Sequence, residues 1–253
     1  MSRVVANLWH RLISGSLQNI EAQTSWSLLP DEFEIIKLFN TGVFVVDNFC
    51  TPEEANNIIE AAKNRMVHSA VMVDGKFRHT AGRISDTARL FGPKYQYSGV
   101  VALMRRAAAL VGLPYTHLED VYVTRYTEGG FYATHIDFGD AFGVDRLYTL
   151  LLYLNSMPEE QGGATVFPSL KTAVQPKIGR AVAWTNKNPD GTGHLETNHA
   201  AFPVKNGGEK WVIQFWFRRY RMIDPIRMGD DTPAKEIRPL RGDEILPEGV
   251  HSN

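Results

Sequence analysis

Cysteine is almost absent from this chain of 253 residues, in which Cys50 is the only one. A single thiol cannot form an intrachain disulfide, so the fold cannot depend on covalent cross-links. Nothing in the cysteine content indicates an oxidising compartment, where disulfides normally form. The sequence therefore predicts a protein of a reducing compartment, most simply the cytoplasm.

Long apolar runs and a charge excess are missing as well. No run approaches the roughly 18 apolar residues that cross a bilayer, and the first residues lack the pattern of a secretory signal. Lys and Arg number 27 against 28 Asp and Glu, which gives a formal net charge of −1. Such a chain has no global field for nucleic acid or an anionic membrane. We therefore expect the partner to be a small molecule or a peptide, and neither nucleic acid nor a membrane. We expect the protein itself to be a monomer or a homodimer.

Internal repeats and low-complexity segments are also absent. A mass of 28.4 kDa suits one sizeable core better than two full domains. We therefore expect a single domain over residues 1–253, made of three parts. Residues 1–117 are predicted to form helical and mixed support with a substrate loop, 118–220 a β core, and 221–253 an irregular tail.

Helices and one early strand are predicted before the β core. Apolar spacing predicts an amphipathic helix over Val4–Ile20, which packs on the core or, alternatively, makes a dimer or membrane contact. Thr51 as N-cap and Pro52 at the first helical position predict a helix that ends near Asn64. The remaining predicted elements are a strand over Thr41–Asp47 and a helix over Ser98–Val111, which Gly112 ends.

From Leu118 to Tyr220 the pattern changes to short strands separated by Gly, Pro and Asn. This pattern is typical of a double-stranded β-helix, the jelly-roll or cupin-like core. The last strand, Lys210–Arg218, is apolar on both faces and should be covered on both sides. We expect a mainly β fold with supporting helices.

His135-Ile136-Asp137 is the most informative motif of this β core. Residues i and i+2 of a strand point the same way, about 7 Å apart, so His135 and Asp137 can share one ion. Two imidazoles and one carboxylate hold non-haem Fe(II) and leave coordination positions open. The third ligand must come from another strand, and His199 is preferred to His194. The alternative is a hydrogen-bonded surface pair without a metal.

Several ordered blocks around this motif resemble the prolyl 4-hydroxylase branch of the Fe(II)- and 2-oxoglutarate-dependent oxygenases. The stronger blocks lie between about residues 120 and 220 and comprise Tyr126–Asp137, Arg146–Asn155, Gly162–Pro168, Pro189–Gly191, His199–Val204 and Lys210–Trp211. A fainter similarity covers Asp47–Glu54 and Arg83–Ser85. Several blocks in the family's order are far more specific than one three-residue motif.

Lys210 is a candidate for binding an anionic group of a small molecule at the same site. A lysine among apolar neighbours is costly to bury without an anion, and the Asn206–Gly208 turn is expected to place its strand beside the strand of His199. The resemblance implies that Lys210 binds the far carboxylate of 2-oxoglutarate, with Tyr126 and Thr149 assisting. The alternative is a lysine that merely extends to solvent from the strand end.

The resemblance also implies roles for residues outside the metal motif. Arg83 and Ser85 are candidates for substrate binding, within a polar stretch over Asp74–Phe91 that is predicted to be a lid or substrate loop. Trp184 is a candidate to line the cosubstrate pocket, although a buried tryptophan is more often part of a core.

The implied activity is hydroxylation of an unactivated C–H bond with Fe(II), 2-oxoglutarate and O2, and ascorbate as reductant. Succinate and CO2 are released. The expected substrate is proline, another amino acid, a peptide or a metabolite derived from an amino acid. Two alternatives remain open: a ring-forming or desaturating oxidation with the same cofactors, and a cupin-like metal-binding sensor without turnover.

Overall fold

The structure is a computed structural model that describes residues 34–37, 42–73, 76–92, 95–139 and 145–222. The helix predicted over residues 4–20 lies outside these residues, as does the predicted tail from residue 223 onward. Within the described residues, no helix is both long enough and apolar enough to cross a bilayer.

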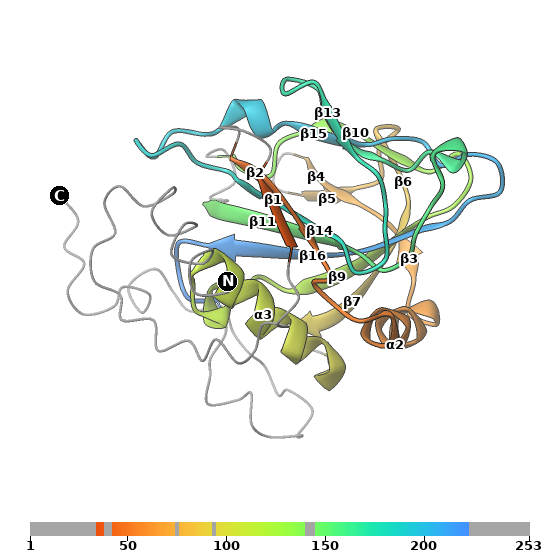
Figure 1. Ribbon diagram of the computed structural model, residues 1–253, viewed down its shortest axis with the longest axis horizontal. Coiled ribbons are helices and arrows are strands. Elements are labelled where there is room, and N and C mark those ends of the chain that lie inside the picture. The colour runs from red at the N-terminus through yellow and green to blue at the C-terminus, as the bar shows by residue number, and fades with distance from the viewer. Residues whose placement is uncertain (1–33, 38–41, 74–75, 93–94, 140–144, 223–253) are drawn as a thin grey trace.

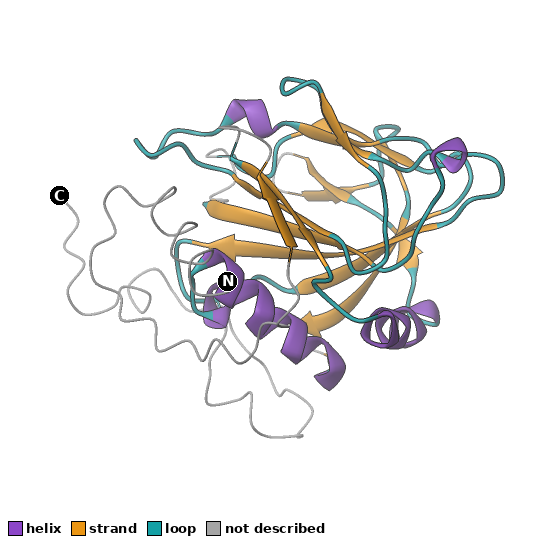
Figure 2. Ribbon diagram, viewed as in Figure 1, coloured by secondary structure: helices purple, strands orange, loops and turns teal. Residues whose placement is uncertain are grey.

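Two antiparallel sheets face each other, and two helices pack below the larger sheet (Figures 1 and 2). The larger sheet has nine strands, in the order β1 (Glu34–Lys37), β2 (Val43–Asp47), β14 (Ala181–Thr185), β11 (Arg146–Tyr153), β16 (Lys210–Arg218), β9 (Val121–Tyr126), β7 (Asp86–Gly92) and β3 (Val67–His68), with β8 (Tyr95–Gln96) beside β7. The smaller sheet has five strands, β13 (Thr172–Val174), β12 (Thr165–Phe167), β15 (His199–Ala201), β10 (Phe131–His135) and β6 (Arg83–Ile84). The chain passes repeatedly between the sheets, which confirms the predicted jelly roll.

Two helices and several short elements complete the described fold. The helices are α2 (Pro52–Lys63) and α3 (Val101–Val111). A separate hairpin joins β4 (Val71–Val73) to β5 (Lys76–Arg78). Single 3-10 turns cover Ser98–Val100, Tyr115–His117, Glu159–Gln161 and Leu195–Thr197.

The helix boundaries follow from capping chemistry. Thr51 accepts a hydrogen bond from the backbone N–H of Glu54, and the Glu54 side chain accepts one from the Thr51 N–H, so α2 begins with a capping box. Gly112 ends α3 with φ 71°, a left-handed conformation that glycine adopts without strain. The predicted second helix is confirmed, with a 3-10 turn over its first residues.

The larger sheet is buried on both faces. One core cluster joins its lower face to α2 and α3 through residues such as Ile58, Leu103 and Phe215. A second cluster fills the space between the two sheets and includes Phe167, Trp184 and Val212. Strand β16 contributes to both clusters, as its apolar faces predict. The space between the sheets is the part of this fold that can hold a site.

Two local predictions differ from the structure. Within the polar stretch Asp74–Phe91, the described residues from 76 onward are largely extended rather than a loop, because β6 and β7 each pair with a strand of the core. Strand β16 does not pair with β15, the strand of His199, because the Asn206–Gly208 turn carries the chain from the smaller sheet to the larger one. Lys210 therefore reaches the interior from the sheet opposite His199.

Candidate active site

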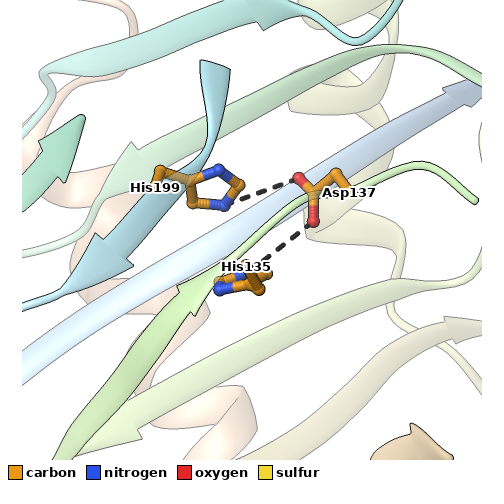
Figure 3. Close-up of side chains that lie close together, drawn as sticks. All are labelled: His135, Asp137 and His199. Carbon is orange, nitrogen blue, oxygen red and sulfur yellow. Dashed lines mark ion pairs between the residues drawn. The ribbon is translucent and has the colours of Figure 1, made fainter. Parts of the chain in front are cut away.

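His135, Asp137 and His199 converge between the sheets (Figure 3). His135 ends β10 and His199 begins β15, and the two residues are cross-strand partners. One ligand atom from each of the three residues lies within 4.8 Å of the other two, and Asp137 and His199 are buried. In the described part of the chain, this is the cluster of His, Cys, Asp and Glu that could hold a metal ion.

Each histidine is oriented by the backbone two residues before it. His135 Nδ1 lies 2.8 Å from the carbonyl oxygen of Ala133, and His199 Nδ1 lies 3.0 Å from that of Thr197. A carbonyl only accepts, so Nδ1 of each ring carries the proton and Nε2 is left with a free lone pair. Both Nε2 atoms lie 3.8 Å from a carboxylate oxygen of Asp137. Histidines that ligate metals are commonly fixed in this way.

The protonation states also suit a metal. Burial and the neighbouring His199 lower the pKa of His135, so its imidazole is neutral near pH 7. Burial alone would raise the pKa of Asp137, but His199, Arg146 and His135 lower it below its usual value. Metal ligands must be deprotonated. Two imidazoles and one carboxylate form the donor set expected for non-haem Fe(II), so these residues fit the ion.

Strand alternation, however, does not position Asp137. Strand β10 ends at His135, and Asp137 lies in the bend that follows. Its carboxylate is held by side chains of the opposite sheet: Thr149 Oγ1 donates to Oδ2 over 2.7 Å and Trp216 Nε1 donates to the same atom over 3.2 Å. Arg146 Nη1 donates to the Asp137 backbone carbonyl over 3.3 Å. The prediction that a strand aligns His135 with Asp137 was therefore wrong, although both residues reach the cluster.

Thr149 contacts Asp137 in this structure, whereas the sequence predicts that it binds 2-oxoglutarate. Its hydroxyl oxygen accepts a hydrogen bond from Asn186 Nδ2 over 2.9 Å, and its hydroxyl hydrogen is directed to the carboxylate. All three residues are buried. A role of Thr149 in cosubstrate binding stays a prediction.

Lys210 is a buried cation without a carboxylate partner among the described residues. Its side chain lies between the sheets and is 1% exposed. The ammonium Nζ lies 3.4 Å from Thr165 Oγ1 and about equally far, 5.4 and 5.5 Å, from the rings of Tyr126 and Tyr153. Burial lowers the pKa of Lys210 to about 7. Lys210 does not extend to solvent, and this environment would favour a bound anion.

Arg83 and Ser85 lie near the metal cluster, on the side of the Tyr132 ring. The Arg83 guanidinium stacks on the Tyr132 ring at 4.7 Å, and that ring stacks on His135 with centroids 3.7 Å apart. Arg83 Nε donates to Ser85 Oγ over 2.8 Å. Ser85 is buried and donates onward to Ser69, so its hydroxyl orients Arg83 and does not face solvent. Arg83 has no carboxylate partner among the described residues.

Trp184, the candidate to line the cosubstrate pocket, and His194, the alternative third metal ligand, have different surroundings. Trp184 is 1% exposed and packs against the ligand His199, with ring centroids 4.5 Å apart. Its indole N–H has no hydrogen-bond partner within the described protein. His194, the alternative third ligand, instead places Nδ1 2.8 Å from Thr185 Oγ1 and lies outside the metal cluster. The fold brings His199, and not His194, close to His135 and Asp137, and the role of His199 as third ligand stays a prediction.

Sequence reasoning missed several residues that line this site. The missed residues are Tyr132, Tyr153, Thr165, Asn186 and Trp216. Trp216 could have been found, because residues 210, 212, 214 and 216 of one strand share a face with Lys210. Asn186 could not, because it follows β14 and reaches Thr149 only through the pairing of β14 with β11.

Comparisons with known proteins agree with this geometry. A family model described as the 2OG-Fe(II) oxygenase superfamily matches residues 121–218. The prolyl 4-hydroxylase subunit alpha-1 of Gallus gallus is 38% identical over 175 residues, which cover 65% of this chain and 33% of that protein. The subunit alpha-2 of Caenorhabditis elegans is 34% identical over 200 residues, or 75% of this chain and 36% of the relative. The chain thus spans about a third of the length of these curated relatives.

A solved structure is similar over nearly its full length. It is the viral collagen prolyl hydroxylase of Paramecium bursaria Chlorella virus-1, in complex with 2OG. The identity is 28% and the TM-score 0.56, and the similarity covers 69% of this chain and 94% of the viral chain. The family match, over residues 121–218, includes all three clustered residues.

Proposed function

We propose that this chain, a prolyl 4-hydroxylase-like 2OG-Fe(II) oxygenase, hydroxylates a carbon of a prolyl residue in a peptide, and that free proline, another amino acid or a derived metabolite is the next candidate substrate. One observation carries the proposal: two histidines with free Nε2 atoms and one carboxylate converge between two sheets, and the space between these sheets also holds a buried lysine that has no anionic partner among the described residues. A metal site that only stabilised the fold would not need this cation.

His135, Asp137 and His199 would hold Fe(II) through two nitrogens and one carboxylate. When bound, the iron supplies the activation of O2, coupled to the oxidative decarboxylation of 2-oxoglutarate to succinate and CO2, that inserts oxygen into a C–H bond. The protein supplies orientation, since the Ala133 and Thr197 carbonyls fix the two imidazoles. Ascorbate is the proposed reductant that keeps the iron ferrous.

Lys210 would bind the far carboxylate of 2-oxoglutarate. Its ammonium is enclosed by Tyr126, Tyr153 and Thr165, which exclude water and strengthen a charge-assisted hydrogen bond. Tyr153 donates its hydroxyl to Thr165 over 2.7 Å, which keeps that threonine in place. The dianionic cosubstrate would thereby neutralise a charge that is costly to bury alone.

Arg83 would bind the substrate. Its Nε and Nη2 atoms donate to hydroxyls of Ser85, Thr87 and Thr124, and Arg83 forms a further side-chain hydrogen bond with the Tyr126 hydroxyl. Because Tyr132 lies between Arg83 and His135, a peptide carbonyl bound by the Arg83 guanidinium would lie near the metal cluster. The names of the relatives favour proline as the residue to be hydroxylated.

A defined assay tests this function. The protein is incubated with Fe(II), 2-oxoglutarate, ascorbate and O2, together with Pro-Pro-Gly repeat peptides, non-collagen prolyl peptides or free proline, and both products are followed by mass spectrometry. We expect succinate together with a peptide that has gained one oxygen. Loss of two hydrogens would instead indicate ring formation or desaturation. No succinate with any substrate would favour a metal-binding sensor without turnover.

Other aspects of the biology stay predictions from sequence. These are a cytoplasmic location, a monomer or homodimer, and the absence of nucleic-acid and membrane partners.

A further inference from the structure

The carboxylate of Asp137 is held asymmetrically. Both side-chain hydrogen bonds that reach it, from Thr149 and from Trp216, end on Oδ2. Each oxygen lies 3.8 Å from one histidine, Oδ1 from His135 Nε2 and Oδ2 from His199 Nε2. Oδ1 also lies 3.8 Å from Arg146 Nη1, and none of these distances is a hydrogen bond. The two oxygens of one carboxylate therefore have different surroundings.

The backbone alone cannot produce this asymmetry. Asp137 lies in a bend after the end of β10, so no sheet hydrogen bond fixes the direction of its side chain. The two donors belong instead to β11 and β16, neighbouring strands of the opposite sheet, where Thr149 and Trp216 are direct cross-strand partners. The larger sheet thus positions a ligand that the smaller sheet supplies.

A third residue sets the direction of the Thr149 hydroxyl. Asn186 Nδ2 donates to Thr149 Oγ1 over 2.9 Å, so the threonine oxygen acts as acceptor there and its own hydrogen is free for Asp137. Asn186 and Thr149 are each 1% exposed, so water does not compete for the bond. The ring of Trp216 is fixed in turn by the Arg146 guanidinium, which stacks on it at 4.1 Å.

We propose that Thr149 and Trp216 are positioning residues that hold Asp137 Oδ2 and leave Oδ1 as the single carboxylate ligand of the metal. A carboxylate can bind a metal through one oxygen or through both. Two-oxygen binding would occupy one more coordination position, and the proposed reaction needs the open positions for 2-oxoglutarate and O2. Asn186 acts through Thr149. This inference rests on the proposed metal site but on no assumption about the substrate.

Metal binding without turnover tests the proposal. Co(II) is titrated into the metal-free protein without 2-oxoglutarate, and binding is followed by calorimetry and by the visible absorption of Co(II), which depends on coordination number. Thr149→Val and Trp216→Phe should each weaken Co(II) binding about 10- to 100-fold, as is typical when a group that orients a ligand is lost. Both variants should also change the Co(II) absorption. Thr149→Ser keeps the hydroxyl and should restore affinity and absorption.

Matched controls separate positioning from general damage to the fold. Thr185→Val removes the hydroxyl of another buried threonine, which bonds His194 and not the metal ligands. Trp211→Phe removes an indole N–H from the same strand as Trp216. Trp211, however, belongs to the core cluster between the larger sheet and the helices, away from the metal ligands. Both should bind Co(II) like the wild type. Wild-type affinity and absorption in Thr149→Val and Trp216→Phe would overturn the inference, whereas failure to hydroxylate any peptide would bear only on the proposed function.

Discussion

His135 and His199 are direct cross-strand partners at the ends of β10 and β15, and their ring centroids lie 4.3 Å apart. This one pairing brings together two ligands that are far apart in sequence. It also places both rings close to Asp137, in the space between the sheets that Lys210 enters from the opposite sheet. The following predictions depend on this arrangement.

Loss of a metal ligand should abolish turnover. His135→Ala and Asp137→Ala each remove one of three proposed ligands, so Fe(II)-dependent formation of succinate from 2-oxoglutarate should fall below detection. Circular dichroism should show that the variants remain folded. His194→Ala is the matched control, because His194 lies near the site but contacts Thr185, and it should keep its activity. Substantial succinate formation by either ligand variant would disprove the assignment of the ligands.

Removal of the Lys210 charge should weaken 2-oxoglutarate binding and leave metal binding unchanged. Lys210→Met keeps the length of the side chain but loses the ammonium. The KM for 2-oxoglutarate should rise about 10- to 100-fold, because a hydrogen bond to a charged group contributes about 1.5–3 kcal/mol. Co(II) affinity measured by calorimetry should stay within about threefold of the wild-type value, which corresponds to about 0.6 kcal/mol. Equal loss of both affinities would place the anion site elsewhere.

Binding of 2-oxoglutarate should depend on pH near neutrality. The pKa of Lys210 is lowered to about 7 by burial, and a bound dianion would raise it, so binding takes up a proton above that value. The apparent Kd should be nearly constant below pH 7 and rise up to about tenfold per pH unit above it. Calorimetry in buffers of different ionisation enthalpy would detect the proton. Lys210→Arg, which stays charged, should lose this dependence.

The Arg83 guanidinium should affect the primary substrate and not the cosubstrate. Arg83→Gln keeps a polar side chain but loses the charge and two of the three side-chain nitrogens. We expect the KM for a prolyl peptide to rise at least about tenfold, which corresponds to about 1.4 kcal/mol, while the KM for 2-oxoglutarate stays near the wild-type value. Arg89→Gln removes an arginine that is paired with Asp120 and is the matched control. An unchanged peptide KM in Arg83→Gln would exclude a substrate role.

Cys50 should be chemically inert in the folded protein. Its thiol is buried, and burial raises its pKa to about 12, so almost no thiolate exists at neutral pH. Thiol reagents should label it only after denaturation, as intact-mass spectrometry would show. Labelling of the native protein at the rate of a free thiol would contradict the buried position.

Much of the fold follows from local sequence rules. The capping residues Thr51 and Pro52 and the left-handed Gly112 predict the ends of α2 and α3, because helix ends depend on neighbouring residues. Strand β16 has the predicted limits, Lys210–Arg218, and the predicted apolar faces. The order of the strands in each sheet was not predicted in detail, because pairing depends on contacts between segments far apart in the chain.

The chain's own residues determined which chemical groups are available: two histidines and one aspartate with the side chains to hold a metal, and a lysine inside an apolar strand. The tertiary structure decided how they meet. It paired His135 with His199, brought Lys210 in from the opposite sheet, and directed Thr149 and Trp216 to the carboxylate of Asp137. The physical reason is that residue type and short-range spacing are local properties, whereas the register between strands and the packing of two sheets arise only when the whole core forms.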